Sequence, residues 1–203
     1  MRGMRGTRHL LGVTLAATMA SALIGCQTFR EIAALENVNF ALRDVTDIDL
    51  AGVRLDGVRS YGDLGPSQVV RLLAAVGQGR LPLRLRVNVL AENPGTNVVT
   101  ARMVRMDWAL LLEGKETVAG SIADAISLPP GTPQVIPIDA SLDLLQFFSE
   151  SGPDLVELVL ALTGQGGGEP KEIAIRATPT IDTPLGAMPY PTPITILRQE
   201  IGG

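Results

Sequence analysis

This chain of 203 residues contains almost no histidine or cysteine, with one of each at His9 and Cys26. Everything after residue 26 therefore lacks both an imidazole and a thiol. Mechanisms that pair serine or cysteine with histidine are excluded there, as are metal centres with histidine ligands. A single cysteine also rules out an internal disulfide, so the domain must be held together by packing alone.

Aromatic residues are scarce as well, at 3% of the chain. Few side chains are available to stack on sugars or bases. The formal charge is −4, so there is no basic excess that would attract nucleic acid. We expect no nucleic-acid partner, no metal and no cofactor, and no catalytic residues.

The N-terminal 26 residues fall into three zones. Arg2, Arg5 and Arg8 form a basic start, and an apolar or small-residue run from Leu10 to Ile24 follows. The pattern is typical of an export signal. The apolar run is about 15 residues long, shorter than the roughly 20 that a membrane-spanning helix needs, although an uncleaved anchor is the alternative.

Residues Leu23-Ile24-Gly25-Cys26 resemble the lipobox of bacterial lipoproteins at all four positions. The resemblance implies removal of residues 1–25, a diacylglycerol on Cys26 and usually an added acyl chain such as palmitate. Each buried acyl methylene contributes about 0.8 kcal/mol, so two or three chains would hold the protein at a membrane. Gln27 resembles the outer-membrane sorting pattern. An exported protein with a spare thiol is the other possibility.

The remaining chain has the composition of one acidic globular domain. Loss of residues 1–25 removes three arginines and changes the formal charge from −4 to −7. The apolar fraction of 46% is ordinary for a folded protein. We divide the chain into a signal peptide at 1–25, a tether at 26–36 and a domain at 37–200.

Apolar residues alternate with polar ones in most of the domain, which predicts strands. The clearest strand is 81–89, and a second at 47–58 is expected to bulge at Gly52. A type II turn is predicted with Pro94 and Gly95 at its centre. Further strands are expected at 38–42, 99–113 with a bulge near Arg102, 115–126, 136–142, 173–177 and 194–196.

Two segments have helical periodicity instead. In 65–79, Val69, Leu72, Leu73 and Val76 share one face and predict a helix that packs on the core. Residues 142–163 predict two short helices with a stripe of Leu155, Leu158, Val159 and Leu162. Short strands, hairpin turns and two helical inserts together indicate a mainly β, antiparallel β-sandwich.

The pattern from 81 to 141 resembles the late embryogenesis abundant type 2 family, or water stress and hypersensitive response domain. It combines alternating strands with Asn93-Pro94, Gly114, Gly120 and the Pro130-Gly131 loop, and "TIDTPLGAMPYP" at 180–191 supplies the final part. The resemblance covers about Asn37 to Arg198. One departure is Gly95, where the family often has a second asparagine.

The resemblance implies an immunoglobulin-like or fibronectin III-like sandwich, association with desiccation or envelope stress, and no catalytic residues. We therefore expect a lipid-anchored, non-catalytic protein on the periplasmic face of the outer membrane. Its partners would be the membrane, through its N-terminal lipid, and an envelope protein or lipid.

Several polar groups are candidates for a site. Asp44, Asp47, Asp49 and Asp56 are oxygen ligands that suit calcium, but their spacing does not match an EF-hand, and solubilising charges on a strand edge are the alternative. Arg84 and Arg86 could bind an anion with Asn88, or pair with acids across strands. The Gly-rich loop at 164–170 lacks the Lys-Ser/Thr of a phosphate loop. Trp108 is expected in the core.

Two other functions compete with the binding or protective one. A carrier or assembly factor would hold an apolar, lipid-like ligand between the sheet and the helices at 66–76 and 142–163. An enzyme using paired carboxylates, such as a glycosidase, would need two acids across one cleft. The low aromatic content argues against the enzyme.

Overall fold

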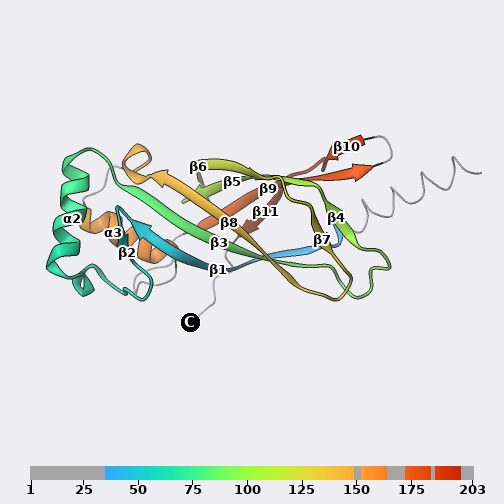
Figure 1. The fold of residues 1–203 in the computed structure, drawn as a ribbon, viewed down its shortest axis with the longest axis horizontal. Helices are drawn as coiled ribbons and strands as arrows, with labels where there is room; N and C mark the ends of the chain where they lie inside the picture. The colour runs from blue at the N-terminus through green and yellow to red at the C-terminus, as the bar shows by residue number, and fades with distance from the viewer. Residues whose placement is uncertain (1–34, 149–151, 164–171, 184–185, 198–203) are drawn as a thin grey trace, which may run out of the picture.

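The computed structural model of the chain describes residues 35–148, 152–163, 172–183 and 186–197. The predicted signal peptide, Cys26 and the loop at 164–170 lie outside these residues. The described chain is mainly β, with antiparallel sheets and two α-helices (Figure 1), which confirms the expected class. None of the helices in these ranges is both long and apolar enough to cross a membrane.

The first sheet has four strands in the order β2-β1-β3-β8. They are β1 (Asn39–Leu50), β2 (Val53–Arg54), β3 (Pro82–Glu92) and β8 (Gln134–Asp143). Every second residue of β3 and β8 is buried, as their alternating sequences predict. One face of this sheet is therefore apolar and the other polar.

The second sheet is built around β9 (Ile173–Thr183) and β5 (Arg105–Leu112), with β6 (Lys115–Ile122) on the far side of β5. Two short strands, β10 (Gly186–Pro189) and β11 (Ile194–Leu197), pair with successive parts of β9. A separate two-stranded sheet joins β4 (Ala101–Met103) to β7 (Ile126–Leu128).

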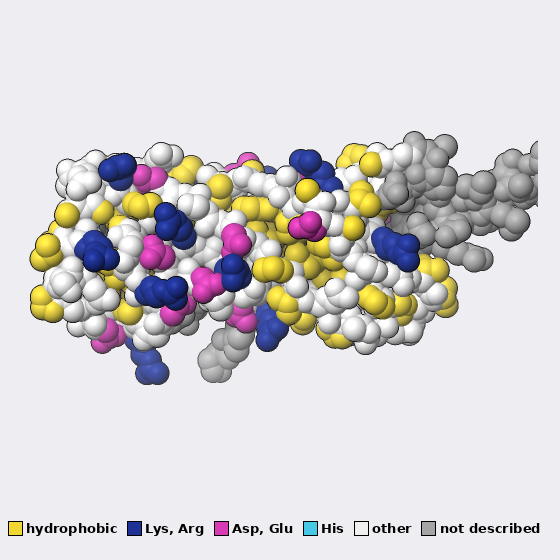
Figure 2. Space-filling view, in the orientation of Figure 1, with side chains coloured by type: hydrophobic (Ala, Val, Ile, Leu, Met, Phe, Trp, Pro, Cys, Tyr) yellow, Lys and Arg dark blue, Asp and Glu magenta, His cyan; other side chains and the backbone are white. Residues whose placement is uncertain are grey.

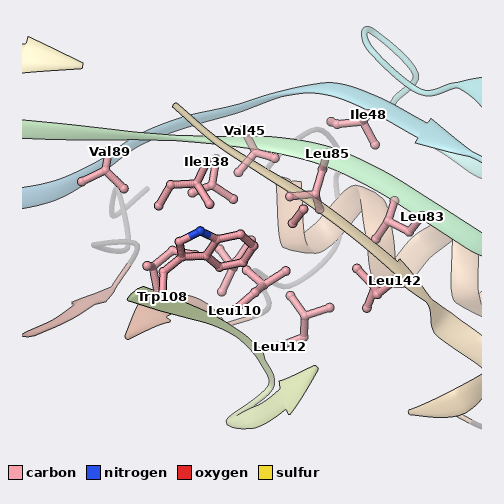
Figure 3. Close-up of a cluster of buried hydrophobic side chains, with 14 of the residues drawn as sticks. Val45, Ile48, Leu83, Leu85, Val89, Trp108, Leu110, Leu112, Ile138 and Leu142 are labelled. Atoms are coloured by element: carbon pink, nitrogen blue, oxygen red, sulfur yellow. The ribbon is translucent and has the colours of Figure 1, made fainter. Parts of the chain in front are cut away.

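Apolar side chains from the two larger sheets form one continuous core. Figure 3 shows Trp108, Leu110 and Leu112 of β5 facing Val45, Leu83, Leu85 and Ile138 from β1, β3 and β8. The core extends to Leu35, the first described residue, which is buried. Packing of aliphatic side chains is thus the main source of stability for a chain without disulfides.

The two helices lie together at one end of the molecule (Figure 1). Helix α2 (Pro66–Gly77) contacts β2, and α3 (Gly152–Thr163) contacts β1 and the 3-10 turn Tyr61–Asp63. The opposite end carries β4, β10, the loop after β3 and the beginning of β1. The molecule therefore has a helical end and a loop end.

Two predictions at turns were wrong in detail. Gly52 is not a bulge: Ala51 and Gly52 both have positive φ and form the two-residue β1–β2 hairpin. The register of β1 against β3 shifts earlier in the strand, between Leu42 and Asp44 and again between Thr46 and Asp49, where Asp47 has φ 53°. At 94–97 the amide of Asn97 donates to the carbonyl of Pro94 at 2.9 Å, so the turn starts at Pro94 rather than placing it second.

The predicted bulge near Arg102 is a change of partner at Val104. Residues 101–103 pair with β7, whereas 105–112 pair with β6 and β9. The alternation of buried and exposed side chains therefore shifts by one residue at Val104, because the chain leaves one sheet and enters another there.

The two α-helices lie within the predicted segments, but some of the residues predicted to be buried are exposed or only half-buried. In α2 only Leu72 is fully buried, and Leu73 is 53% exposed. In α3 the buried set is Leu155, Val156, Val159 and Leu160, with Leu158 half-buried. The first of the two helices expected at 142–163 is a single 3-10 turn, Leu144–Gln146, because β8 continues to Asp143.

Candidate functional site

The polar face of the first sheet holds the arginines singled out from the sequence. Arg86 in β3 donates from Nε to Asp139 of β8 at 2.7 Å and from Nη1 to Asp47 of β1 at 2.7 Å. The hydrogen bond and charge of Asp139 raise the pKa of Arg86. One guanidinium thus connects three adjacent strands, and the cross-strand reading of Arg86 is confirmed.

Asn88 lies on the same face and is also engaged. Its amide donates to Asp44 at 2.5 Å and to Thr46 at 3.2 Å, both on β1. Arg84, between them and the helical end, is exposed and forms no ion pair with any described residue. Arg84, Arg86 and Asn88 therefore do not form an anion-binding site together, because Arg86 and Asn88 are already bonded to side chains of neighbouring strands.

The four aspartates of the calcium candidate are separated by the fold. Asp47 pairs with Arg86, while Asp49 accepts from the amide of Gly52 at 3.0 Å and closes the hairpin. Asp56 lies 4.0 Å from Arg54. No group of three or more metal-ligating side chains comes together in the described ranges. These carboxylates act as strand and turn partners.

Asn93, which the sequence shows only as part of the Asn93-Pro94 motif, has a buried polar side chain. It is fully buried, and its amide donates to the carbonyls of Val99 at 3.1 Å and Leu128 at 2.8 Å. The main-chain carbonyl of Asn93 accepts from the main-chain amide of Gly131 at 2.7 Å. Asn93 therefore fastens the loop after β3 to the loop after β7.

The same two loops lie side by side at Gly95 and Gly131. A Cβ on Gly131 would lie 3.7 Å from the Cα of Gly95, and Gly131 has φ +70°. The Asn-Pro-Gly and Pro-Gly motifs of the sequence are thus one structural unit. The sequence signal for this unit is Asn93, an asparagine directly before a proline at the end of a buried strand.

Trp108 is in the core, as predicted. It is buried, and its ring lies against Gly120 of the neighbouring strand β6. A Cβ built on Gly120 would be 2.6 Å from the Cζ2 of Trp108. The strand therefore has a glycine at position 120 because the ring of Trp108 occupies the place of a side chain there, and not because the strand bends.

Tyr190 follows β10 at the loop end of the molecule. Burial raises the pKa of its hydroxyl, and the negative charge of Glu36 raises it further. The amide of Tyr190 also donates to the carbonyl of Pro179 in β9 at 2.7 Å.

Comparisons with known proteins give little beyond this description. No family model and no curated protein matches the chain. A protein from Archaeoglobus fulgidus is 14% identical over 58% of this chain and 81% of its own, with a TM-score of 0.33. A late embryogenesis abundant protein studied in solution is 14% identical over 99% of this chain and 95% of its own, with a TM-score of 0.35. Both scores are too low to bear on function.

Proposed function

We propose that this chain is a lipid-anchored, non-catalytic envelope protein of the late embryogenesis abundant type 2 class, with an immunoglobulin-like or fibronectin III-like domain. It binds or protects envelope components under desiccation or envelope stress, on the periplasmic face of the outer membrane. The class comes from the residue pattern between 81 and 191, and the anchor from the four lipobox positions ending at Cys26.

The observation that carries the non-catalytic assignment is the way in which polar groups are used. Arg86, Asn88 and the neighbouring aspartates bond to adjacent strands. Asn93 uses its amide to join two loops. Side chains that could have formed a reactive cluster are bonded in structural pairs, and most of these pairs face solvent, where they contribute little to stability and would be screened by salt.

The carrier alternative has less support. Its ligand was expected between the sheet and the helices, where Leu72 of α2 and Leu155, Val159 and Leu160 of α3 are buried in the common core. These side chains belong to the same apolar cluster as the strands, and such a cluster needs no ligand to cover it. Native mass spectrometry of the protein taken from envelopes would reopen the alternative if a lipid of constant mass remained bound.

The anchor is tested by metabolic labelling with an alkyne fatty acid. We expect label on the wild-type protein and none on Cys26→Ser, because the thiol is the attachment atom for the diacylglycerol. The variant should also keep residues 1–25, since lipidation precedes cleavage in this pathway. Equal labelling of both proteins would contradict the anchor, and intact mass would show which residues remain.

The stress role is tested in cells. A strain without the protein should survive drying and rehydration less well than one complemented with the wild type. A strain complemented with Cys26→Ser should resemble the deletion if location at the membrane matters. Equal survival of all three strains would contradict the stress role but leave the anchor intact.

A further inference from the structure

Three segments lie at the loop end of the molecule, and we call them together the uncharged end: residues 93–100, 129–133 and 186–193. The first two are loops joined by the hydrogen bonds of Asn93 with Leu128 and Gly131. The third begins with strand β10 and lies at the same end, since Val104, next to β4, donates to Thr180 of β9, where β10 also pairs. Figure 1 shows β4 and β10 at this same end.

These loops differ from the rest of the chain in charge. They contain 21 residues without a single Asp, Glu, Lys or Arg, whereas charged residues make up 19% of the whole sequence. The nearest exposed charges along the chain are Glu92 and Arg102, at the bases of the first loop. In Figure 2, charged side chains crowd the half that carries α2, and the other end is mainly apolar or neutral around a basic side chain.

Apolar side chains project from the uncharged end into solvent. Val98 is 89% exposed and Met188 is 43% exposed. Prolines 94, 129 and 130 of the first two segments are half-buried. Val98 lies in the loop after β3 and Met188 in strand β10, and because both side chains gain little burial from the fold, they suit contact with another apolar phase.

The polypeptide enters the domain at this end. Asn39 at the start of β1 pairs with Glu92, directly before the first loop, and Figure 1 shows the beginning of β1 at this end. Only eight residues, 27–34, separate Cys26 from Leu35. At roughly 3.3–3.6 Å per residue they span at most about 30 Å. A lipid on Cys26 would therefore hold this end near the bilayer.

We propose that the uncharged end rests on the bilayer to which the chain is tethered, with Val98 and Met188 inserted among the lipid headgroups. The proposal rests on the lipid anchor of the proposed function. Because the three segments themselves carry no charged side chain, they can enter the interface without stripping water from ions. The same orientation keeps the acidic remainder of the domain away from anionic lipids, which would repel it.

The test uses the full lipidated protein in phosphatidylcholine vesicles, with an environment-sensitive nitrobenzoxadiazole (NBD) dye on one introduced cysteine. Because lipidation occupies Cys26, the new thiol is the single free one. Val98→Cys probes the uncharged end, and Leu73→Cys is the matched control at an exposed apolar site on α2, at the opposite end. Thermal unfolding by circular dichroism checks that both variants keep the wild-type fold.

We expect the dye at position 98 to shift to the blue and to be quenched by spin-labelled lipids at least twofold more than the dye at 73. Equal quenching at the two sites, or stronger quenching at 73, would overturn the proposal and in the second case point to α2 as the membrane contact. An unquenched dye at 98 in vesicles that shifts to the blue only in native envelopes would overturn it in favour of a protein partner. Wild-type protein that fails to float with vesicles would instead remove the anchor itself.

Discussion

At the scale of single residues, the structure explains features that the sequence shows without giving their reason. Gly120 interrupts a strand because the ring of Trp108 lies where its Cβ would be. Asn93 is hydrophilic and would ordinarily be placed on the surface, yet it is buried because two loop carbonyls need a donor. Contacts of this kind join residues distant in sequence, so alternation and propensity do not reveal them.

The packing of Trp108 on Gly120 predicts an inverted substitution effect. Alanine normally suits a strand better than glycine, but Gly120→Ala should destabilise the protein by about 1–3 kcal/mol, the usual cost of overpacking a core. Urea unfolding would measure it.

Ser121→Ala is the matched control for this change, because Ser121 is the next residue of β6 and is exposed. It should change the free energy of unfolding by less than about 0.5 kcal/mol. A stabilising effect of Gly120→Ala would show that the ring does not occupy this space.

At the scale of elements, the strands could be predicted well and their partners less so. The alternation in β3 and β8 gave the correct buried face at every position from Leu81 to Val89 and from Ile136 to Leu142. The switch of partners at Val104 was not predictable, because a phase change looks the same whether it comes from a bulge or from a second sheet.

Helix α2 was predicted from its period, but the period could not tell how deeply it lies. Its apolar residues surround most of the helix, so a stripe at 69, 72, 73 and 76 was only one of several possible buried faces. The helix packs at the end of the sheets rather than across one of them, and it leaves Val70 and Leu73 65% and 53% exposed. The position of α2 in the fold, and not its periodicity, therefore determines which of its apolar residues are buried.

The two neighbouring leucines of α2 should respond differently to the same truncation. Leu72→Ala should lower the free energy of unfolding by about 2–5 kcal/mol, as for other buried leucines. Leu73→Ala should change it by less than about 0.5 kcal/mol, since its side chain is mostly in water already. Chemical denaturation of both variants checks this, and equal losses would mean that α2 is rotated from the described orientation.

At the scale of the whole molecule, burial is unevenly distributed along the long axis. The central strands β3 and β5 are bonded on both sides and carry fully buried residues such as Leu83 and Leu110. In helix α2 only Leu72 is buried, and Val69, Ala75 and Val76 pack against the core while still partly exposed. Local stability follows such differences, because weakly packed elements open without unfolding the rest.

Hydrogen exchange should therefore be graded along the molecule. Amides of α2 should exchange well before those of β3 and β5, which should exchange only through global unfolding. Mass spectrometry of peptides from each element would measure the order. Exchange in α2 as slow as in β3 would contradict the prediction and indicate that another surface covers the helix.

The candidate site shows the same division between what sequence patterns reveal and what they do not. The pairing of Arg86 with acids on neighbouring strands was foreseeable from its place on a polar strand face. The uncharged end was not, because its three segments are up to 100 residues apart in the chain and come to the same end of the molecule only after folding. A lack of charge is inconspicuous in any one loop, and only their adjacency gives it meaning.

The position of Trp108 has a practical consequence, since the chain has a single tryptophan and it lies where the two sheets meet. Tryptophan fluorescence therefore reports on this one location, without background from other indoles. A red shift of the emission would indicate that water reaches the interface between the two sheets. An apolar ligand bound there would change the emission while the far-UV circular dichroism spectrum stayed constant.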